Sequence, residues 1–126
     1  MLRALFIDDD ADFLEGVSEI ATQEGFAVSS AKSLAQAREL LTAEPADLVL
    51  IDLMLPDGDG IGLLRELKET ANSEVIIVSG MATVDSAIEA LRLGALDYLT
   101  KPLDIRSLST CSSTVFRRRM SSGLVR

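Results

Sequence analysis

The amino-acid sequence predicts an α/β fold, (βα)5, in which five parallel strands and five helices alternate to form a doubly wound sheet. Short apolar runs alternate along the chain with segments whose apolar residues recur at helical spacing. One run, residues 48–51, is entirely apolar, as a central strand covered on both faces requires. Because single helices join successive strands, we expect a parallel sheet with right-handed crossovers.

The predicted strands are the short apolar runs, taken in chain order. The first run leads directly into Asp8, and Lys101-Pro102 breaks the last one. A loop rich in turn residues, residues 54–60, follows the central run. The strands are predicted at residues 2–7, 26–30, 48–51, 75–78 and 96–99.

The helices are predicted from apolar residues at helical spacing and from the residues that begin and end them. Asp12 and Glu15 resemble a capping box before the first helix, and Gly25 ends that helix. Ser33 and Gln36 form a capping-box pair before the second. The defining apolar residues lie within residues 13–21, 34–41, 61–67, 84–91 and 105–115.

Length and composition fit one globular domain. The chain has 126 residues, of which 48% are hydrophobic, and a net charge of −8. This acidic balance argues against direct nucleic-acid binding by the domain. We expect a domain at residues 1–119, and a C-terminal tail or the start of a linker at residues 120–126. No apolar run is long enough for a membrane span or a signal peptide, so a cytoplasmic location is expected.

The absence of histidine and the single cysteine restrict the chemistry. Without histidine there is no histidine general base, no histidine metal ligand and no phosphohistidine carrier. One cysteine, Cys111, allows neither a disulfide framework nor a cysteine-rich zinc site. We expect Cys111 to be a small packing residue rather than a reactive thiol.

Chemically useful side chains follow four of the five predicted strands. They are Asp8 and Asp9, Asp52, Ser79 and Lys101. In a doubly wound sheet the carboxyl ends of the strands meet at one edge, so these groups should converge. Carboxylate oxygens suit Mg²⁺, while an ammonium and a hydroxyl could bind phosphoryl oxygens. The set predicts a receptor for a phosphoryl group carried on one carboxylate.

The chain resembles the receiver domains of two-component response regulators over residues 2 to about 118. Four segments carry the resemblance: FIDDD (6–10), LIDLMLPDGDG (50–60), IVSG (77–80) and GALDYLTKPL (94–103). It implies a flavodoxin-like, CheY-like three-layer sandwich with strand order 2-1-3-4-5. The segment from Ser79 to Leu103 is most similar to receivers joined to NtrC-type transcriptional activators.

The resemblance also implies a site. Asp52 would accept phosphate from the phosphohistidine of a sensor histidine kinase or phosphotransfer protein. Asp9, Asp52 and the backbone carbonyl of Met54 would hold Mg²⁺, with Asp8 acting through bound water. Ser79 and Lys101 would bind the phosphoryl oxygens, as catalytic groups for the protein's own phosphorylation rather than for turnover of a substrate.

The implied response is a conformational switch. Tyr98 would turn inward as Ser79 moves, and the Lys101-Pro102 peptide bond would be cis. The surface formed by the fourth helix, the fifth strand and the fifth helix would carry the output, with a possible homodimer through that face and control of transcription. Met54 is apolar and should not position a hydrolytic water, so we expect a phosphorylated lifetime not shortened by this side chain.

Structural roles are alternatives for several of these residues. Asp10 and Asp12 are expected to be helix N-terminal charges, and Asp57 and Asp59 to be turn residues. Tyr98 could instead pack on the last helix.

Two other functions use similar residues. A magnesium-dependent phosphatase would need a second acid near Asp52, where Leu53 and Met54 stand, and a cap domain. A flavin-binding module would need a phosphate-cradling loop after the first strand, where Asp8, Asp9 and Asp10 would repel phosphate.

Overall fold

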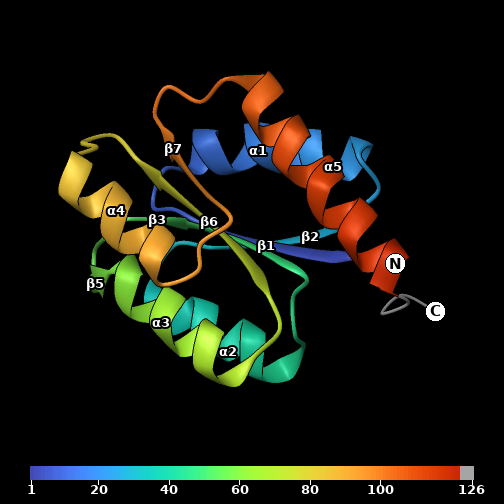
Figure 1. The fold of residues 1–126 in the computed structure, drawn as a ribbon, viewed down its shortest axis with the longest axis horizontal. Coiled ribbons are helices and arrows are strands. Elements are labelled where there is room, and N and C mark those ends of the chain that lie inside the picture. The colour runs from blue at the N-terminus through green and yellow to red at the C-terminus, as the bar shows by residue number, and fades with distance from the viewer. Residues whose placement is uncertain (123–126) are drawn as a thin grey trace.

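The computed structural model describes residues 1–122, which form one parallel sheet with helices on both faces (Figure 1). The strands of this sheet are β1 (Arg3–Ile7), β2 (Ala27–Ala31), β3 (Leu48–Asp52), β6 (Glu74–Ser79) and β7 (Asp97–Thr100). Their order is β2-β1-β3-β6-β7, and every neighbouring pair is parallel. This confirms the expected (βα)5 topology, because β6 and β7 are the fourth and fifth strands of the main sheet.

Four helices connect these strands, and a fifth follows the last strand. They are α1 (Ala11–Gln23), α2 (Leu34–Ala43), α3 (Gly60–Thr70), α4 (Val84–Arg92) and α5 (Ile105–Ser122). Figure 1 shows α1 and α5 together on one face of the sheet, with α2 and α3 on the opposite face. Three layers result, with the sheet between the two layers of helices (Figure 1). No helix within residues 1–122 is both long and apolar enough to cross a membrane.

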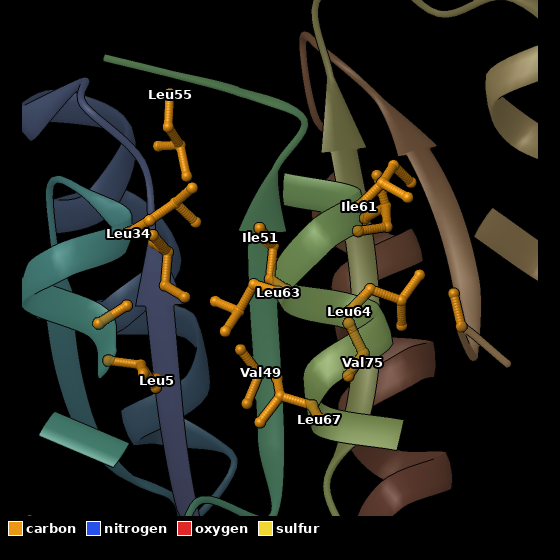
Figure 2. Packing of buried hydrophobic residues seen from close by; sticks show 14 of the residues in the cluster. Leu5, Leu34, Val49, Ile51, Leu55, Ile61, Leu63, Leu64, Leu67 and Val75 are labelled. Atoms are coloured by element: carbon orange, nitrogen blue, oxygen red, sulfur yellow. The ribbon is translucent and has the colours of Figure 1, made fainter. Parts of the chain in front are cut away.

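Alternating side chains of the buried strands divide the core into two clusters. On β3, Val49 and Ile51 face α2 and α3, whereas Leu48 and Leu50 face α1 and α5. All four side chains are fully buried, which explains why this run contains no polar residue before Asp52. Figure 2 shows the first cluster, with Leu5, Leu34, Val49, Ile51, Leu55, Ile61, Leu63, Leu64, Leu67 and Val75 labelled.

The residues that begin the first two helices differ from the sequence-based prediction. The N-cap of α1 is Asp10, whose side chain accepts hydrogen bonds from the backbone N–H groups of Asp12 and Phe13. The expected Asp12 cap is therefore wrong by two residues, because Asp10 is the residue with extended backbone. Ser33 caps α2 as expected, but the side chain of Gln36 accepts from Lys32 rather than from Ser33.

Two further segments are more ordered than expected. The loop at residues 54–60 contains a two-stranded antiparallel pair, β4 (Met54–Leu55) with β5 (Gly58–Asp59). The last helix continues to Ser122, so residues 120–122, expected to begin a C-terminal tail or a linker, are helical. Residues 123–126 of that expected tail lie outside the described residues.

The last turns of α5 are attached to the opposite edge of the sheet from the acidic residues. Arg119 is buried and donates hydrogen bonds to the backbone carbonyls of Asp47 and Asn72. Arg118 forms an ion pair with Glu74 at 3.3 Å. The basic cluster at residues 117–119 thus has a structural role beyond a favourable charge at the helix C-terminus.

Candidate functional site

The carboxyl ends of β1 and β3 bring three acidic residues together. Asp8 and Asp9 directly follow β1, and Asp52 is the last residue of β3. These two strands are neighbours, with Ile7 paired to Ile51, so the residues after them leave the sheet side by side. One oxygen from each carboxylate lies within 4.8 Å of the others. The convergence predicted from the sequence is therefore present in the structure.

This cluster has the chemical character of a hard-cation site. Asp8 and Asp52 are buried while Asp9 is exposed, so the group opens to solvent on one side. Three carboxylates against the single ammonium of Lys101 leave an excess of negative charge, which a divalent cation would neutralise. Oxygen ligands of this kind are those that Mg²⁺ prefers, usually with several waters retained. The residues present therefore fit a magnesium ion.

Lys101 reaches into the cluster from the end of β7. Its ammonium nitrogen lies 2.6 Å from Oδ2 of Asp8 and 3.3 Å from Oδ2 of Asp52. The contact with Asp8 is a short ion pair, although its angles are outside those of a well-formed hydrogen bond. The same nitrogen lies 4.5 Å from the centre of the Phe13 ring on α1. Lys101 is held by two carboxylates and one aromatic face.

Burial and pairing shift the pKa values of this pair. Burial raises the pKa of the Asp8 carboxyl above its ordinary value, because desolvation outweighs the contact with Lys101 and the hydrogen bond from the N–H of Asp10. Burial alone would lower the pKa of Lys101. Its contacts with Asp8 and Asp52 outweigh that effect, so the pKa of Lys101 is raised. Lys101 therefore remains an ammonium near neutral pH.

Backbone groups hold the carboxylates of Asp8 and Asp52 in position. The N–H of Asp10 donates to Oδ1 of Asp8 at 2.9 Å, and the N–H of Met54 donates to Oδ1 of Asp52 at 3.1 Å. Gly60 packs against the Asp52 backbone so closely that an added Cβ would lie 2.5 Å from its carbonyl oxygen. The requirement for glycine at position 60 was not recognised in the sequence, where Gly60 was one of several turn residues.

Ser79 and Met54 are near the cluster but do not contact it through their side chains. Ser79 ends β6, is buried, and its hydroxyl accepts a hydrogen bond from the N–H of Met81 at 3.0 Å. Within residues 1–122 no side-chain hydrogen bond joins Ser79 to Asp52 or Lys101. The Met54 side chain is exposed. Both residues flank the carboxylates, and their expected roles remain predictions.

Tyr98 lies on β7 and contacts α4 rather than α5. Its ring packs against the core cluster formed with α2 and α3, and its hydroxyl lies 2.7 Å from the hydroxyl of Ser86. The alternative that Tyr98 packs on the last helix is therefore wrong. The peptide bond between Lys101 and Pro102 is cis, as the resemblance implied.

The remaining acidic residues have structural roles, although Asp59 ends β5 and caps a helix rather than lying in a turn as expected. Asp10 caps α1, and Asp59 caps α3 by accepting from the N–H of Ile61. Asp57 accepts from the N–H groups of Leu34 and Ala35, so it caps α2 from a loop far along the chain. Sequence reasoning placed Asp57 in a turn but missed this contact, because it depends on the tertiary packing of two distant segments.

Cys111 is a packing residue, as expected. It is buried on α5, and its thiol lies 3.6 Å from Oδ2 of Asp97. Burial, with a further contribution from the Asp97 carboxylate, raises the pKa of Cys111 to about 11. The thiol is therefore protonated near neutral pH and is a poor nucleophile.

A groove opens beside the carboxylates, between α1 and the segment that joins β7 to α5. Its volume is about 960 Å³. Apolar side chains of α1 line it, together with Asp10, Asp12 and Lys101. Because Lys101 contacts Asp52, the groove lies next to the acidic cluster and is large enough for part of another molecule.

Comparisons with known proteins agree with the fold. The family of response regulator receiver domains matches residues 4–111. The chain is 36% identical over 118 residues to the response regulator protein PilR of Pseudomonas aeruginosa, covering 93% of this chain and 26% of PilR. It is 38% identical over 104 residues to the TorCAD operon transcriptional regulatory protein TorR of Escherichia coli O157:H7, covering 82% of this chain and 45% of TorR. The chain thus spans less than half of either relative.

Solved structures give the same result. The beryllofluoride-activated NtrC4 receiver domain dimer aligns with a TM-score of 0.87 at 29% identity, covering 94% of this chain and 98% of that chain. The receiver domain of the Francisella response regulator 1452 aligns with a TM-score of 0.85 at 32% identity, with 94% and 98% coverage.

Proposed function

Because this chain belongs to the response regulator receiver domains, which are signalling domains rather than metabolic enzymes, we propose that it accepts a phosphoryl group on Asp52 and changes conformation in response. The observation that carries the proposal is the convergence of Asp52 with Asp8, Asp9 and Lys101 at one end of the sheet. We assign Asp52 as the nucleophile because its carboxylate contacts Lys101 and its backbone is fixed by the strand and by Gly60.

The chemistry is a phosphoryl transfer between the donor and the Asp52 carboxylate. An oxygen of Asp52 attacks phosphorus while the bond to the donor breaks, and the leaving group takes the bonding electrons. When bound, Mg²⁺ would reduce repulsion between the carboxylates and the phosphoryl oxygens. Asp9, Asp52 and the Met54 carbonyl would hold it, with Asp8 contributing through water. Lys101 would pair with one phosphoryl oxygen and the Ser79 hydroxyl would donate to another.

The donor is a phosphohistidine on a sensor histidine kinase or a phosphotransfer protein. The chain has no histidine, so the phosphohistidine lies outside these 126 residues. The groove between α1 and the residues after Lys101 supports this assignment, because Lys101 both lines the groove and contacts Asp52. Its acidic edge at Asp10 and Asp12 favours a partner surface that carries positive charge.

Intact mass spectrometry after incubation with Mg²⁺ and acetyl phosphate tests the proposal. We expect the protein to gain one phosphoryl group, and Asp52→Asn to gain none. Asp10→Asn is the matched control, because asparagine also caps helices well and the substitution removes one nearby negative charge without touching the cluster. Equal labelling of Asp52→Asn and the native protein would refute the assignment of Asp52.

The output is a change in association through the face formed by α4, β7 and α5. Val84, Ile88 and Leu91 are exposed apolar side chains spaced along one side of α4. The receiver domain of NtrC4 is described as a dimer in its beryllofluoride-activated form. By analogy, this domain would form a homodimer when phosphorylated and so control an attached or associated transcriptional activity.

Light scattering with and without beryllofluoride tests the homodimer. We expect a shift from monomer toward dimer with the native chain and a weaker shift in Ile88→Ser. A monomer under both conditions would refute the dimer while leaving phosphorylation of Asp52 untouched.

A further inference from the structure

The hydroxyl of Tyr98 is attached to the first turn of α4 through Ser86. The two hydroxyl oxygens lie 2.7 Å apart, and both residues are half-buried. Within residues 1–122 this is the one side-chain hydrogen bond that links α4 to another element. Only Ala90 of this helix is buried. The contact is therefore the main polar restraint on a helix that has few apolar ones.

Ser86 also belongs to the cap of the same helix. It forms a capping box with Thr83, in which each side chain accepts a hydrogen bond from the backbone N–H of the other residue. The Ser86 hydroxyl lies 3.0 Å from the Thr83 hydroxyl and 3.1 Å from the Thr83 carbonyl oxygen. Four polar groups, including the Tyr98 hydroxyl, thus lie within hydrogen-bond distance of one serine oxygen.

A serine hydroxyl cannot satisfy all four groups at once. It has one hydrogen to donate and two lone pairs that accept, so at most three strong hydrogen bonds can form. The contact with Tyr98 is the shortest of the four, and the bond from the Thr83 N–H is the longest at 3.3 Å. Tyr98 and the cap of α4 therefore compete for Ser86.

We propose that Ser86 is a positioning residue that holds Tyr98 in the conformation seen here and exchanges it for a complete α4 cap when Tyr98 moves away. The proposal rests on the proposed phosphorylation switch, in which Tyr98 leaves this position. Because Ser86 gains cap hydrogen bonds when it loses Tyr98, the two conformations differ little in hydrogen bonding. Ser86 thereby links the movement of Tyr98 to the geometry of the first turn of α4.

Tyr98 itself provides the readout, because the chain has one tyrosine and no tryptophan. Its absorption and fluorescence report the environment of this one phenol. In the absence of any phosphoryl mimic, we expect Ser86→Ala to shift both the absorption and the fluorescence of Tyr98. Ser86→Thr keeps the hydroxyl, so its spectra should match those of the native protein. Circular dichroism checks that each variant is folded. Unchanged tyrosine spectra in Ser86→Ala would overturn the proposal.

The affinity for beryllofluoride, measured with Mg²⁺ present, tests the exchange of partners. Tyr98→Phe removes a hydrogen bond that only the present conformation contains, so we expect roughly two- to tenfold tighter binding. Ser86→Ala removes this bond and also the cap bonds that replace it, so it should change the affinity less, and adding Tyr98→Phe to Ser86→Ala should have no further effect. Thr83→Ala is the matched control, because it removes the Thr83 hydroxyl that competes with Tyr98 for Ser86 and should weaken binding. Changes of the same sign in Thr83→Ala and Tyr98→Phe would overturn the competition.

Different measurements test the phosphorylation switch and the role of Ser86 in holding Tyr98. A native protein that never responds to beryllofluoride refutes the phosphorylation switch, whereas the spectra of Ser86→Ala without beryllofluoride still decide whether Ser86 holds Tyr98.

Discussion

The ammonium nitrogen of Lys101 lies closer to Asp8 than to Asp52, at 2.6 Å against 3.3 Å. Asp8 is completely buried, so Lys101 compensates a carboxylate that water cannot reach. A cation bound by the carboxylates would neutralise part of the negative charge that Lys101 now neutralises. Lys101 would then be available to a phosphoryl group on Asp52. In this arrangement the lysine would stabilise the acidic cluster before phosphorylation and bind the phosphoryl group after it.

Lys101→Ala should destabilise the protein in the absence of divalent cations. The substitution leaves the buried carboxylate of Asp8 without its ammonium partner. For a partly exposed pair, removal of one partner lowers the free energy of unfolding by roughly 1–3 kcal/mol. Saturating Mg²⁺ should recover much of the loss. Urea denaturation with and without Mg²⁺ measures both effects.

Lys101→Ala should also allow phosphorylation of Asp52 without the change in association state that normally follows it. Asp52 remains, so we expect Lys101→Ala still to accept a phosphoryl group but not to change its association state. Lys32→Ala, which removes an exposed positive charge elsewhere, is the control. A normal response in Lys101→Ala would contradict the role assigned to this lysine.

Asp9→Asn should remove the stabilisation of the fold by Mg²⁺. Binding to the native state alone raises stability by about 2.7 kcal/mol at a ligand concentration one hundred times its dissociation constant. Asp9 is the exposed carboxylate of the cluster, so its substitution should leave the core intact. Without Mg²⁺ the variant should be at least as stable as the native protein, because one repelling charge is gone. Thermal denaturation at several Mg²⁺ concentrations measures this.

The control for Asp9→Asn is the neighbouring substitution Asp10→Asn. Asp10 caps α1 and is not one of the three converging carboxylates, so its variant should keep the full increase in melting temperature with Mg²⁺. Equal Mg²⁺ responses in the two variants would mean that the cation is not bound where the carboxylates converge.

Local patterns in the sequence were sufficient to predict the sheet and the position of the site. The run at residues 48–51 is apolar because both faces of β3 are covered, and Asp52 marks the point where the strand meets solvent. Strand ends predicted from such runs are close to those observed. Convergence of Asp8, Asp9 and Lys101 on Asp52 then follows from parallel topology alone.

Contacts that depend on distant packing could not be predicted. Nothing near Phe13 in the sequence indicates that its ring lies beneath Lys101, and nothing near Asp57 indicates that it caps α2. The capping box between Thr83 and Ser86 was missed for another reason, since serine replaces the usual Glu or Gln at the third helical position.

Gly60→Ala should destabilise the protein and displace Asp52. An added Cβ would lie 2.5 Å from the Asp52 carbonyl oxygen and 2.6 Å from a methyl group of Ile51, so the backbone of α3 must move away from β3. Overpacking of this kind costs roughly 1–3 kcal/mol. Gly62→Ala, on the same helix, adds a Cβ that meets nothing within 4 Å. It should be neutral or stabilising by up to about 1 kcal/mol, because alanine favours helix.

Urea denaturation of both glycine variants, combined with acetyl phosphate labelling, checks these expectations. Gly60→Ala should lose stability and label more slowly, whereas Gly62→Ala should label at the native rate. Native labelling in a folded but destabilised Gly60→Ala would show that the position of Asp52 tolerates the shift.

Asp57→Asn should reduce stability near neutral pH and have a diminishing effect in acid. Hydrogen bonds from the N–H groups of Leu34 and Ala35 lower the pKa of Asp57 below the ordinary value of 3.8. A carboxyl whose pKa is lower in the folded state stabilises that state above its unfolded pKa, and the contribution disappears as pH falls through the folded pKa. The difference in unfolding free energy between native and variant should therefore be constant above about pH 5 and shrink below pH 4.

Ser33→Ala is the matched control for this pH dependence. Ser33 caps the same helix α2 but does not titrate, so its removal should cost roughly 0.5–2 kcal/mol at every pH at which the protein is folded. Urea denaturation of the native protein, Asp57→Asn and Ser33→Ala between pH 3 and pH 7 gives the free energy of unfolding at each pH. A charged cap and a neutral cap differ in how their contributions to this free energy change with pH. Parallel pH profiles for Asp57→Asn and the native protein would show that the Asp57 carboxylate contributes no charge-dependent stability, and that α2 is held by Ser33 and its core contacts alone.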